Sequence, residues 1–390
     1  MADRMLRPDT AIISAIFTES QPNSIEILAH SFTNCTFKAE FQNRSAVIVR
    51  LDTASGSLAV VSAIQEAASL QIPTYVPEIL SYGKVVTENQ GDVHYMVTRF
   101  ITETVTLESV WPSLNLTQKT SLVDAVANAV DKLQQLDTSH ALLQQILPNT
   151  ALDAVANSRD ISIGSSFLGF VKSVREFIAL YVAKHQAKRF ATSSIEDALD
   201  GDGIVIRSAL PELGEIHLSS RDLEVLETSL VLSHNDLEPR NLLVRKAEGE
   251  DGPHYELAAI IDWEMAGLLP SSFETAVKDV SLGSNNQYLD YYLMFKEKTR
   301  STISGGESSE KLIKAVRLID GSWSQQMKRN VGAETRRRWI SREGLELSDD
   351  AFEGWILKAA GDGTKREIRS CSKADNKELE DQVLRDFGML

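Results

Sequence analysis

The chain has 390 residues, of which 43% are hydrophobic and 24% charged, as in a soluble globular protein with two to three domains or one large two-lobed domain. Its 55 acidic and 40 basic residues give a formal net charge of −15, which argues against nucleic acids and anionic membranes as partners and favours a cationic small substrate. No stretch has the roughly 18 consecutive apolar residues of a spanning helix and the N-terminus has no signal-peptide pattern, so we expect a cytoplasmic protein.

The first part of the chain predicts a small antiparallel sheet with one helix. Residues typical of strands are concentrated in Cys35–Phe41 and Ser45–Asp52, and the polar stretch between them predicts a hairpin. Apolar residues recur at helical spacing in Ser57–Gln71, which predicts a helix. The prolines of Ile72–Leu80 end this helix and predict an extended segment, and Val93–Ile101 predicts another strand. This order of elements indicates an α+β lobe with a mostly antiparallel sheet.

Helices dominate the rest of the chain. An apolar stripe through Leu122, Val126, Val130 and Leu133 predicts an amphipathic helix, and Phe167–His185 predicts a second one. The composition of Ser304–Glu310 is typical of a flexible connector. We therefore divide the chain into an N-terminal extension (1–27), a small sheet-rich lobe (28–104), a larger helical lobe (105–300) and a charged helical C-terminal region (301–390).

The stretch "VLSHNDLEPRNLLVRK" carries His234, Asp236 and Asn241 at H-x-D-x-x-x-x-N spacing between two apolar, strand-like runs. Taken alone, an aspartate and an asparagine in such a loop are usually turn formers. About one hairpin later, however, Asp262 ends the apolar run of "LAAIIDWE". Phosphoryl transfer needs a carboxylate that orients the attacking hydroxyl group and oxygen ligands for Mg²⁺. Because both motifs occur in the order of the H-R-D and D-F-G motifs of protein kinases, they predict a phosphotransfer site.

The stretches "SHNDLEPRNLLV" and "AIIDWEMAG" resemble the aminoglycoside phosphotransferase and choline kinase-like family. The resemblance covers roughly residues 28 to 285, and "GSSFLGFVKSVREF" is similar to a helical insert of fungal-type members, where the acceptor site lies. It implies an α+β, two-lobed protein kinase-like fold. It also implies an ATP- and Mg²⁺-dependent enzyme that phosphorylates a hydroxyl group of a small metabolite.

The resemblance also implies roles for individual residues of the two loops. Asp236 would be the catalytic carboxylate that accepts or orients the proton of the acceptor. Asn241 and Asp262 would bind Mg²⁺. His234 would support the loop by hydrogen bonding, and Trp263 would pack under the metal-binding turn.

In the small lobe, the resemblance implies that Arg50 of "IVRL" holds the nucleotide phosphates and pairs with Glu66 of the following helix. An arginine on a strand can equally point to solvent. The turn "HSFTNCTF" has no glycine, although backbone amides cradle phosphates best where no side chain intervenes. Ser31, Thr33 and Asn34 are the residues that would cover the phosphates instead.

Two departures from the family pattern lie in the catalytic loop. Asn235 stands where a small residue is usual, and Arg240 stands where glycine is frequent. The glycine-free turn supports an alternative, a non-catalytic pseudokinase-like module that binds a nucleotide or metabolite. The complete set of Asp236, Asn241 and Asp262 opposes it. An α+β hydrolase is not supported, because the chain has neither a G-x-S-x-G nor an H-E-x-x-H motif.

Overall fold

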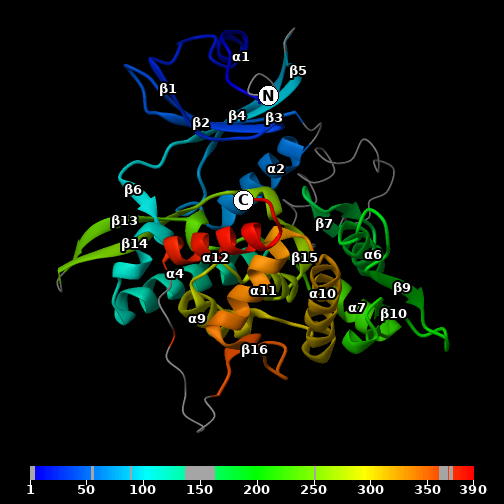
Figure 1. The fold of residues 1–390 in the computed structure, drawn as a ribbon. Coiled ribbons are helices and arrows are strands. Elements are labelled where there is room, and N and C mark those ends of the chain that lie inside the picture. Colours follow the sequence, from blue (N-terminus) through cyan, green and yellow to red (C-terminus); the bar gives the residue numbers. More distant parts are fainter. Residues whose placement is uncertain are drawn as a thin grey trace.

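In a computed structural model, the described part of the chain comprises residues 5–53, 57–87, 90–136, 163–249, 252–359, 368 and 372–390. The chain forms two lobes, and Figure 1 shows the smaller lobe above the larger one. The smaller lobe contains a five-stranded antiparallel sheet in the order β1-β2-β3-β5-β4. Its elements are α1 (Thr10–Ile16), β1 (Ser24–His30), β2 (Asn34–Glu40), β3 (Val47–Asp52), α2 (Ser57–Gln71), β4 (Ile79–Thr87) and β5 (Gly91–Arg99).

The predicted hairpin and helix of the smaller lobe are confirmed. Strands β2 and β3 pair antiparallel, with Phe37 opposite Val49, and both side chains are fully buried. Ile12 of α1 packs into the same apolar cluster, so residues before the sheet contribute to its core. The prediction for Ile72–Leu80 is confirmed at both ends, since α2 ends at Gln71 and Ile79 and Leu80 belong to β4, but the chain forms a turn between them. The N–H of Tyr75 donates to the carbonyl of Ile72 at 2.9 Å, because the fixed φ of proline also suits turns.

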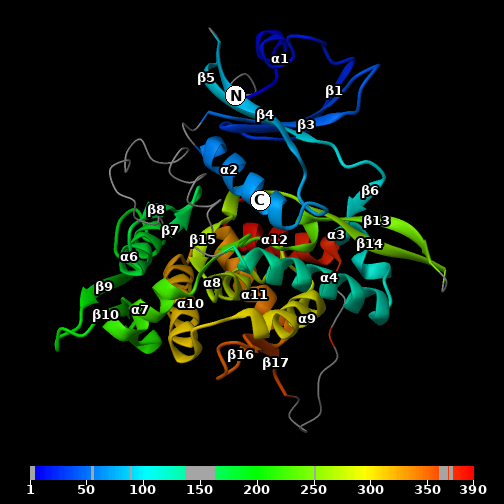
Figure 2. The ribbon, with the colours of Figure 1, turned by 180° about the vertical axis from the view of Figure 1, so that it is seen from behind.

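The larger lobe begins with β6, which pairs with β13, and continues with helices that surround small sheets. Its elements are β6 (Thr104–Thr106), α3 (Leu107–Val110), α4 (Leu116–Gln134), β7 (Ile163–Ser165), β8 (Gly169–Val171), α6 (Val174–Lys184), β9 (Ser193–Asp197), β10 (Ile204–Ser208), β11 (Glu215–Leu218), α7 (Ser220–Thr228), β12 (Leu230–Ser233), β13 (Leu242–Gly249), β14 (Gly252–Ile260), β15 (Gly267–Pro270), α8 (Phe273–Ser281), α9 (Leu289–Thr299), α10 (Gly306–Gln326), α11 (Val331–Glu343), β16 (Leu345–Leu347), β17 (Trp355–Leu357) and α12 (Lys373–Asp386). Figure 2 shows α4 on the opposite side of this lobe from α12.

The predicted helix over Phe167–His185 is wrong in its first third. Gly169–Val171 forms β8, and α6 begins only at Val174. Gly169 has φ +98°, which a helix does not permit, and the side chain of Ser173 caps α6 by accepting a hydrogen bond from the N–H of Glu176. The aromatic residues suggested a longer helix, but the glycine and the serine decide where it begins.

The flexible connector predicted over Ser304–Glu310 is also wrong. Helix α10 begins at Gly306, and Ser308 and Ser309 are buried. The Oγ of Ser308 donates to Asp222 Oδ1 at 2.8 Å. Gly305, with φ +92°, provides the backbone turn into the helix. The small polar residues are therefore used for close helix packing, which composition alone does not reveal.

One apolar cluster lies beneath the predicted catalytic segments and joins the two lobes. It includes Leu58 of α2, Val126 of α4, Val244 of β13 and Trp263 after β14. These segments therefore have fixed positions relative to one another. The structure confirms the α+β, two-lobed fold, with a small antiparallel sheet and a larger helical part. Within the described residues, no helix has the length and apolar character needed to cross a membrane.

Candidate active site

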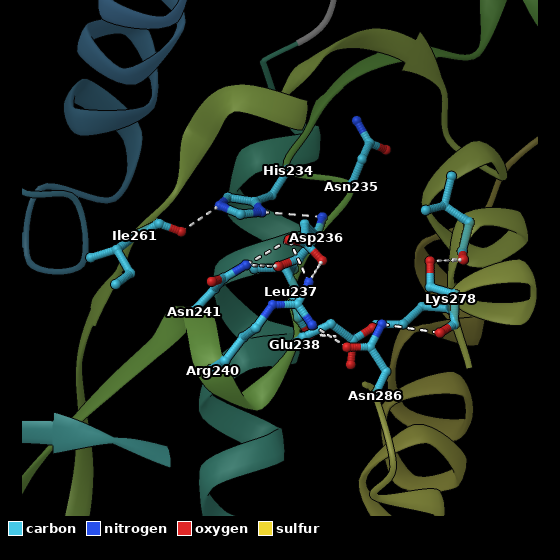
Figure 3. A network of polar contacts seen from close by, with 12 residues as sticks. His234, Asn235, Asp236, Leu237, Glu238, Arg240, Asn241, Ile261, Lys278 and Asn286 are labelled. Carbon is cyan, nitrogen blue, oxygen red and sulfur yellow. Dashed lines mark hydrogen bonds and ion pairs between the residues drawn. The ribbon is translucent and has the colours of Figure 1, made fainter. Parts of the chain in front are cut away.

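The loop between β12 and β13 contains the H-x-D-x-x-x-x-N motif, and Figure 3 shows its side chains. Its second residue, Asn235, has φ +63°, a left-handed conformation that asparagine tolerates better than most residues. The N–H of Asn235 donates to Glu274 Oε1 at 3.0 Å, and its Nδ2 donates to the carbonyl of Met265 at 3.0 Å. The departure at position 235 thus connects the predicted catalytic loop to α8 and to the turn after Asp262.

Asp236 lies at the centre of this loop. Both of its carboxylate oxygens accept hydrogen bonds from Nη2 of Arg240, at 2.7 and 2.8 Å. Asn241 donates through Nδ2 to Asp236 Oδ2 at 2.7 Å and to the Asp236 carbonyl at 2.9 Å. The structure therefore brings the predicted catalytic carboxylate and one predicted metal ligand into direct contact. Asn241 uses its amide nitrogen for this contact, and its Oδ1 is the atom with which it would bind a metal.

His234 is fully buried and supports the loop from behind. Its Nδ1 accepts from the N–H of Asp236 at 3.3 Å, so Nε2 is the protonated nitrogen and donates to the carbonyl of Ile261 at 3.1 Å. Its ring packs edge-to-face on the buried Trp263, at a centroid distance of 4.7 Å. Burial lowers the pKa of His234 to about 4, although the negative charge of Asp236 opposes this change. The neutral imidazole thus holds two segments together, which agrees with a supporting role.

The β13–β14 hairpin brings Asp262 to the catalytic loop. Its register pairs Leu242 with Ile260, and the N–H of Ile261 donates to the carbonyl of Asn241 at 2.9 Å. Asp262 itself has φ +66°. Such strain in a non-glycine residue is often found at functional sites. Burial raises the pKa of Asp262, a change that the neighbouring Glu264 reinforces.

Arg50 of β3 reaches across from the smaller lobe, but not to its expected partner. Its Nη1 donates to Asp262 Oδ1 at 3.2 Å, and its Nη2 contacts Glu264 Oε2. The predicted pairing with Glu66 is not formed in this structure, because Glu66 lies on an exposed face of α2, beside a cavity that β4 also lines. The Nε of Arg50 is buried and, among the described atoms, has no hydrogen-bond partner. Arg50 therefore points toward Asp262 and not to solvent.

The glycine-free turn between β1 and β2 is closed by its own side chains. The Oγ of Ser31 donates to Asn34 Oδ1 at 2.9 Å and accepts from the N–H groups of Thr33 and Asn34 at 3.2 and 3.1 Å. The N–H of Ser31 donates to the carbonyl of Asn34 at 2.8 Å. Three of the backbone amides that could cradle a phosphate are thus engaged within the turn. The nucleotide-binding role of Ser31 and Asn34 stays a prediction.

The sequence analysis missed two charged residues of α8 that lie beneath the catalytic loop. Lys278 contacts the carbonyl of Leu237 and pairs with Glu238 Oε1 at 2.9 Å, and both charged side chains are more than nine-tenths buried. Glu274 is also buried and accepts from Asn235. The spacing of these two residues was a usable signal, because Glu274 and Lys278 are four residues apart and therefore lie on one face of a helix.

The buried Glu274 leads to a prediction about pH. Burial raises the pKa of Glu274 to about 7. Because the folded-state pKa is above the unfolded value of about 4.5, protonation of Glu274 stabilises the fold fully below pH 4.5 and this stabilisation is lost as pH rises through 7. Glu274→Gln keeps an acceptor for Asn235 and cannot ionise. Relative to wild type, its free energy of unfolding should increase by up to about 3 kcal/mol between pH 5 and pH 8.5.

Urea unfolding of both proteins at these two pH values measures this difference. All other titrating groups are common to both proteins, so their contributions cancel in the comparison. An equal difference between variant and wild type at both pH values would show that Glu274 titrates normally.

Comparisons with known proteins identify the family. A family model described as the phosphotransferase enzyme family matches residues 24–277. No match was found among the curated proteins. Among solved structures, the streptomycin–ATP–APH(2")-IIa ternary complex is 13% identical, with 82% of this chain and 90% of that chain covered and a TM-score of 0.43.

Two further structures show similar values. For the GDP and kanamycin complex of APH(2")-IIia, the identity is 13%, the coverage 97% and 98%, and the TM-score 0.45. For the spectinomycin phosphotransferase APH(9)-Ia with ADP and spectinomycin, the identity is 13% and the TM-score 0.43, with 89% of this chain and 98% of that chain covered. At this level of similarity the structures do not identify a substrate for this chain. The family model does cover well over half of the chain, including both loops of the site. The chain therefore belongs to the phosphotransferase enzyme family.

Proposed function

We propose that this protein transfers the terminal phosphoryl group of ATP to a hydroxyl group of a small molecule. The observation that carries the proposal is that side-chain and backbone hydrogen bonds connect four candidate residues from three segments. Asn241 Nδ2 lies 2.7 Å from Asp236 Oδ2, the backbone of Asn241 is bonded to the residue before Asp262, and Asp262 Oδ1 lies 3.2 Å from Nη1 of Arg50. A base, two oxygen ligands and a phosphate-binding cation are the groups that phosphoryl transfer requires.

In this reaction, the carboxylate of Asp236 orients the hydroxyl group of the acceptor and receives its proton. The hydroxyl oxygen forms a bond to the terminal phosphorus, while the bond from this phosphorus to the bridging oxygen breaks and leaves ADP. Arg240 and Asn241 hold the Asp236 carboxylate during this step. Orientation of this kind supplies much of the catalysis in phosphoryl transfer, which needs little covalent chemistry from the protein.

The nucleotide and its metal would be held by Arg50, Asn241 and Asp262. Carboxylate and amide oxygens are the hard donors that Mg²⁺ prefers, and it usually completes its coordination with water and substrate phosphates. This fits the described residues, which contain no group of three or more His, Cys, Asp or Glu that could hold a metal by themselves. When bound, Mg²⁺ would neutralise charge on the phosphates. The buried, unpartnered Nε of Arg50 is a further donor for a phosphate oxygen.

The acceptor would reach Asp236 near a cavity of about 680 Å³ that Arg240 lines. Its other charged lining residues are Glu108, Lys373, Lys377 and Glu380. Because these charges are mixed, the cavity does not by itself select a cation, and the cationic character of the acceptor stays a prediction. The similarity of residues 164–177 to a fungal-type insert stays a prediction as well.

One observation favours the alternative, a module that binds a nucleotide without transferring phosphate. The backbone amides of Ser31, Thr33 and Asn34 are engaged within their own turn. The grip on the phosphates would then depend on Arg50 and the metal. Measurement of phosphoryl transfer distinguishes the two functions. Only a phosphotransferase has a rate of transfer, and this rate should fall when Asp236 is replaced.

The binding of ATP and Mg²⁺ is tested by thermal unfolding of wild type and Asp262→Ala. A ligand present at about 100 times its Kd stabilises the folded protein by about 2.7 kcal/mol. We expect the melting temperature of wild type to rise by an amount that corresponds to this stabilisation with ATP plus Mg²⁺, and by much less with ATP alone. Asp262→Ala should lose most of the metal-dependent shift, because the replacement removes one of the two proposed ligands.

Each protein is compared with its own melting temperature without nucleotide, because Asp262→Ala also removes a partner of Arg50. Asp131→Ala is the matched control, since Asp131 lies on the exposed face of α4. It should keep the full shift. No shift in wild type at any ATP concentration would refute the ATP-dependent function.

A further inference from the structure

Arg240, which stands where the family often has glycine, grips both oxygens of Asp236. The two Nη2 contacts, at 2.7 and 2.8 Å, hold the plane of the carboxylate. The Asp236 side chain is 20% exposed and that of Arg240 is 38% exposed, so the pair lies at the edge of the site and not in the core. Arg240 therefore contacts the catalytic carboxylate from the side open to solvent.

The contacts leave the two oxygens of Asp236 with different capacities. Oδ2 accepts from both Arg240 and Asn241, whereas Oδ1 accepts from Arg240. A carboxylate oxygen has about two lone-pair positions. Oδ2 is thus saturated, and Oδ1 keeps one position for a further donor. Oδ1 is therefore the oxygen that would receive the hydroxyl proton of the acceptor.

Arg240 is held by a residue from a different part of the lobe. Its Nη1 contacts Asn286 Oδ1, as Figure 3 shows. Asn286 lies in the turn between α8 and α9, where its N–H donates to the carbonyl of Gly283 at 3.0 Å and its Nδ2 to the carbonyl of Ser281 at 3.1 Å. Because Asn286 is tied to the backbone twice, it fixes the guanidinium group of a side chain that is otherwise flexible.

This turn is supported by α12, near the C-terminus. Asn376 of α12 is buried and donates through Nδ2 to the carbonyl of Ser284 at 3.2 Å and to Oε1 of Gln287. Its Oδ1 accepts from Nη2 of Arg342 in α11 at 2.7 Å. In Figure 1, α12 crosses the side of the larger lobe that faces the viewer. These polar contacts and the backbone of the turn between α8 and α9 therefore connect α12 to the Asp236 carboxylate.

We propose that Arg240 is a positioning residue that orients Asp236 for catalysis, and that α12 keeps it in place through Asn376 and the turn that carries Asn286. The inference rests on the proposed phosphotransferase function. It gives the C-terminal region a role in the reaction through the position of Arg240.

The first test compares Arg240→Ala with wild type in ADP formation with ATP, Mg²⁺ and a panel of hydroxylated small molecules. We expect kcat to fall on the order of 10- to 100-fold, the loss that follows from a poorly oriented catalytic group. The shift in melting temperature with ATP plus Mg²⁺ should remain. Added guanidinium ion, at concentrations that do not unfold the protein, should restore part of kcat. Arg240→Lys keeps the charge but has a single nitrogen, so it cannot contact Asp236 and Asn286 through two separate groups as Arg240 does, and it should recover only part of the rate.

Arg245→Ala is the matched control, because Arg245 is an exposed arginine of β13 whose guanidinium group contacts the carbonyl of Thr102. It should keep the wild-type rate. A wild-type kcat in Arg240→Ala, or a loss that guanidinium does not restore, would overturn the positioning role. Absence of turnover in wild type would instead refute the proposed function, and this inference with it.

The role of α12 is tested by Asn376→Asp. This replacement keeps an acceptor for Arg342 but turns a carboxylate oxygen toward the oxygens of Ser284 and Gln287. We expect kcat to fall about 10-fold with an unchanged nucleotide-induced shift. Glu378→Gln, at an exposed position of α12, should have the wild-type kcat. An unchanged kcat in Asn376→Asp would show that α12 does not support Arg240.

Discussion

Replacing Asp236 with asparagine is expected to lower the rate of phosphoryl transfer by about 10²- to 10⁴-fold, the range that a positioned general base contributes. Asparagine has the size of aspartate and preserves the backbone of the loop, but its amide group cannot take up the proton of the acceptor. It also removes the charge that Arg240 contacts. The rate is measured as ADP formation with ATP, Mg²⁺ and a panel of hydroxylated small molecules.

The nucleotide-induced shift in melting temperature separates a loss of chemistry from a loss of folding. Asp236→Asn should keep this shift, because Asp262 and Arg50 remain in contact. Asp131→Asn, on the exposed face of α4, is the matched control and should have the wild-type rate. If the rate of Asp236→Asn were within about two-fold of the wild-type rate, the loss would be far smaller than removal of a general base produces. Such a result would contradict this role of Asp236.

A second large effect is expected at Asp279 of α8, whose contacts lie outside the loop between β12 and β13. Its fully buried carboxylate accepts from Tyr292 Oη at 2.6 Å, from Lys296 Nζ at 2.8 Å and from Nε of Arg317 at 2.8 Å. Burial lowers the pKa of Lys296 to about 8, so the lysine is still largely protonated at pH 7. One carboxylate therefore compensates two cations. Asp279→Asn should lower the free energy of unfolding by about 3–5 kcal/mol, because it removes the buried carboxylate that both cations contact.

Urea unfolding at pH 7 measures this loss, and Asp350→Asn is its control. Asp350 pairs with Arg300 at 2.8 Å, but both side chains are more than one-third exposed. Water screens such a pair, so its replacement should cost less than about 1 kcal/mol. Equal losses in the two variants would show that the buried cluster contributes no more than a surface ion pair.

The packing around Asp279 also requires a glycine. Gly354 has φ +81°, and a Cβ atom there would lie 2.6 Å from Asp279 Oδ1 and 2.0 Å from the Tyr292 hydroxyl. This cluster connects α8 to α9, α10 and the loop before β17. Glu274 and Lys278 of the same helix contact the loop between β12 and β13, so the cluster helps to hold the helix that supports this loop.

The sequence by itself determined the elements whose pattern is local. Alternating and helical apolar spacing predicted the β2–β3 hairpin, α2 and α4, because each pattern reflects one buried face of one element. It also determined the proximity of Asn241 and Asp262. The two residues are joined by a single hairpin, although a bulge between Leu243 and Val244 shifts its register by one residue.

Only the tertiary structure decided which distant side chains meet at this site. Arg50 and Asp262 are 212 residues apart, and Arg240 and Asn286 are 46 residues apart. Sequence spacing predicts neighbours along one helix or hairpin, whereas such contacts depend on how whole elements pack. Burial likewise placed the serines of the first turn of α10 in a packed interface and Glu274 and Lys278 beneath the loop, because a polar side chain is stable in the interior only where its partners are already assembled.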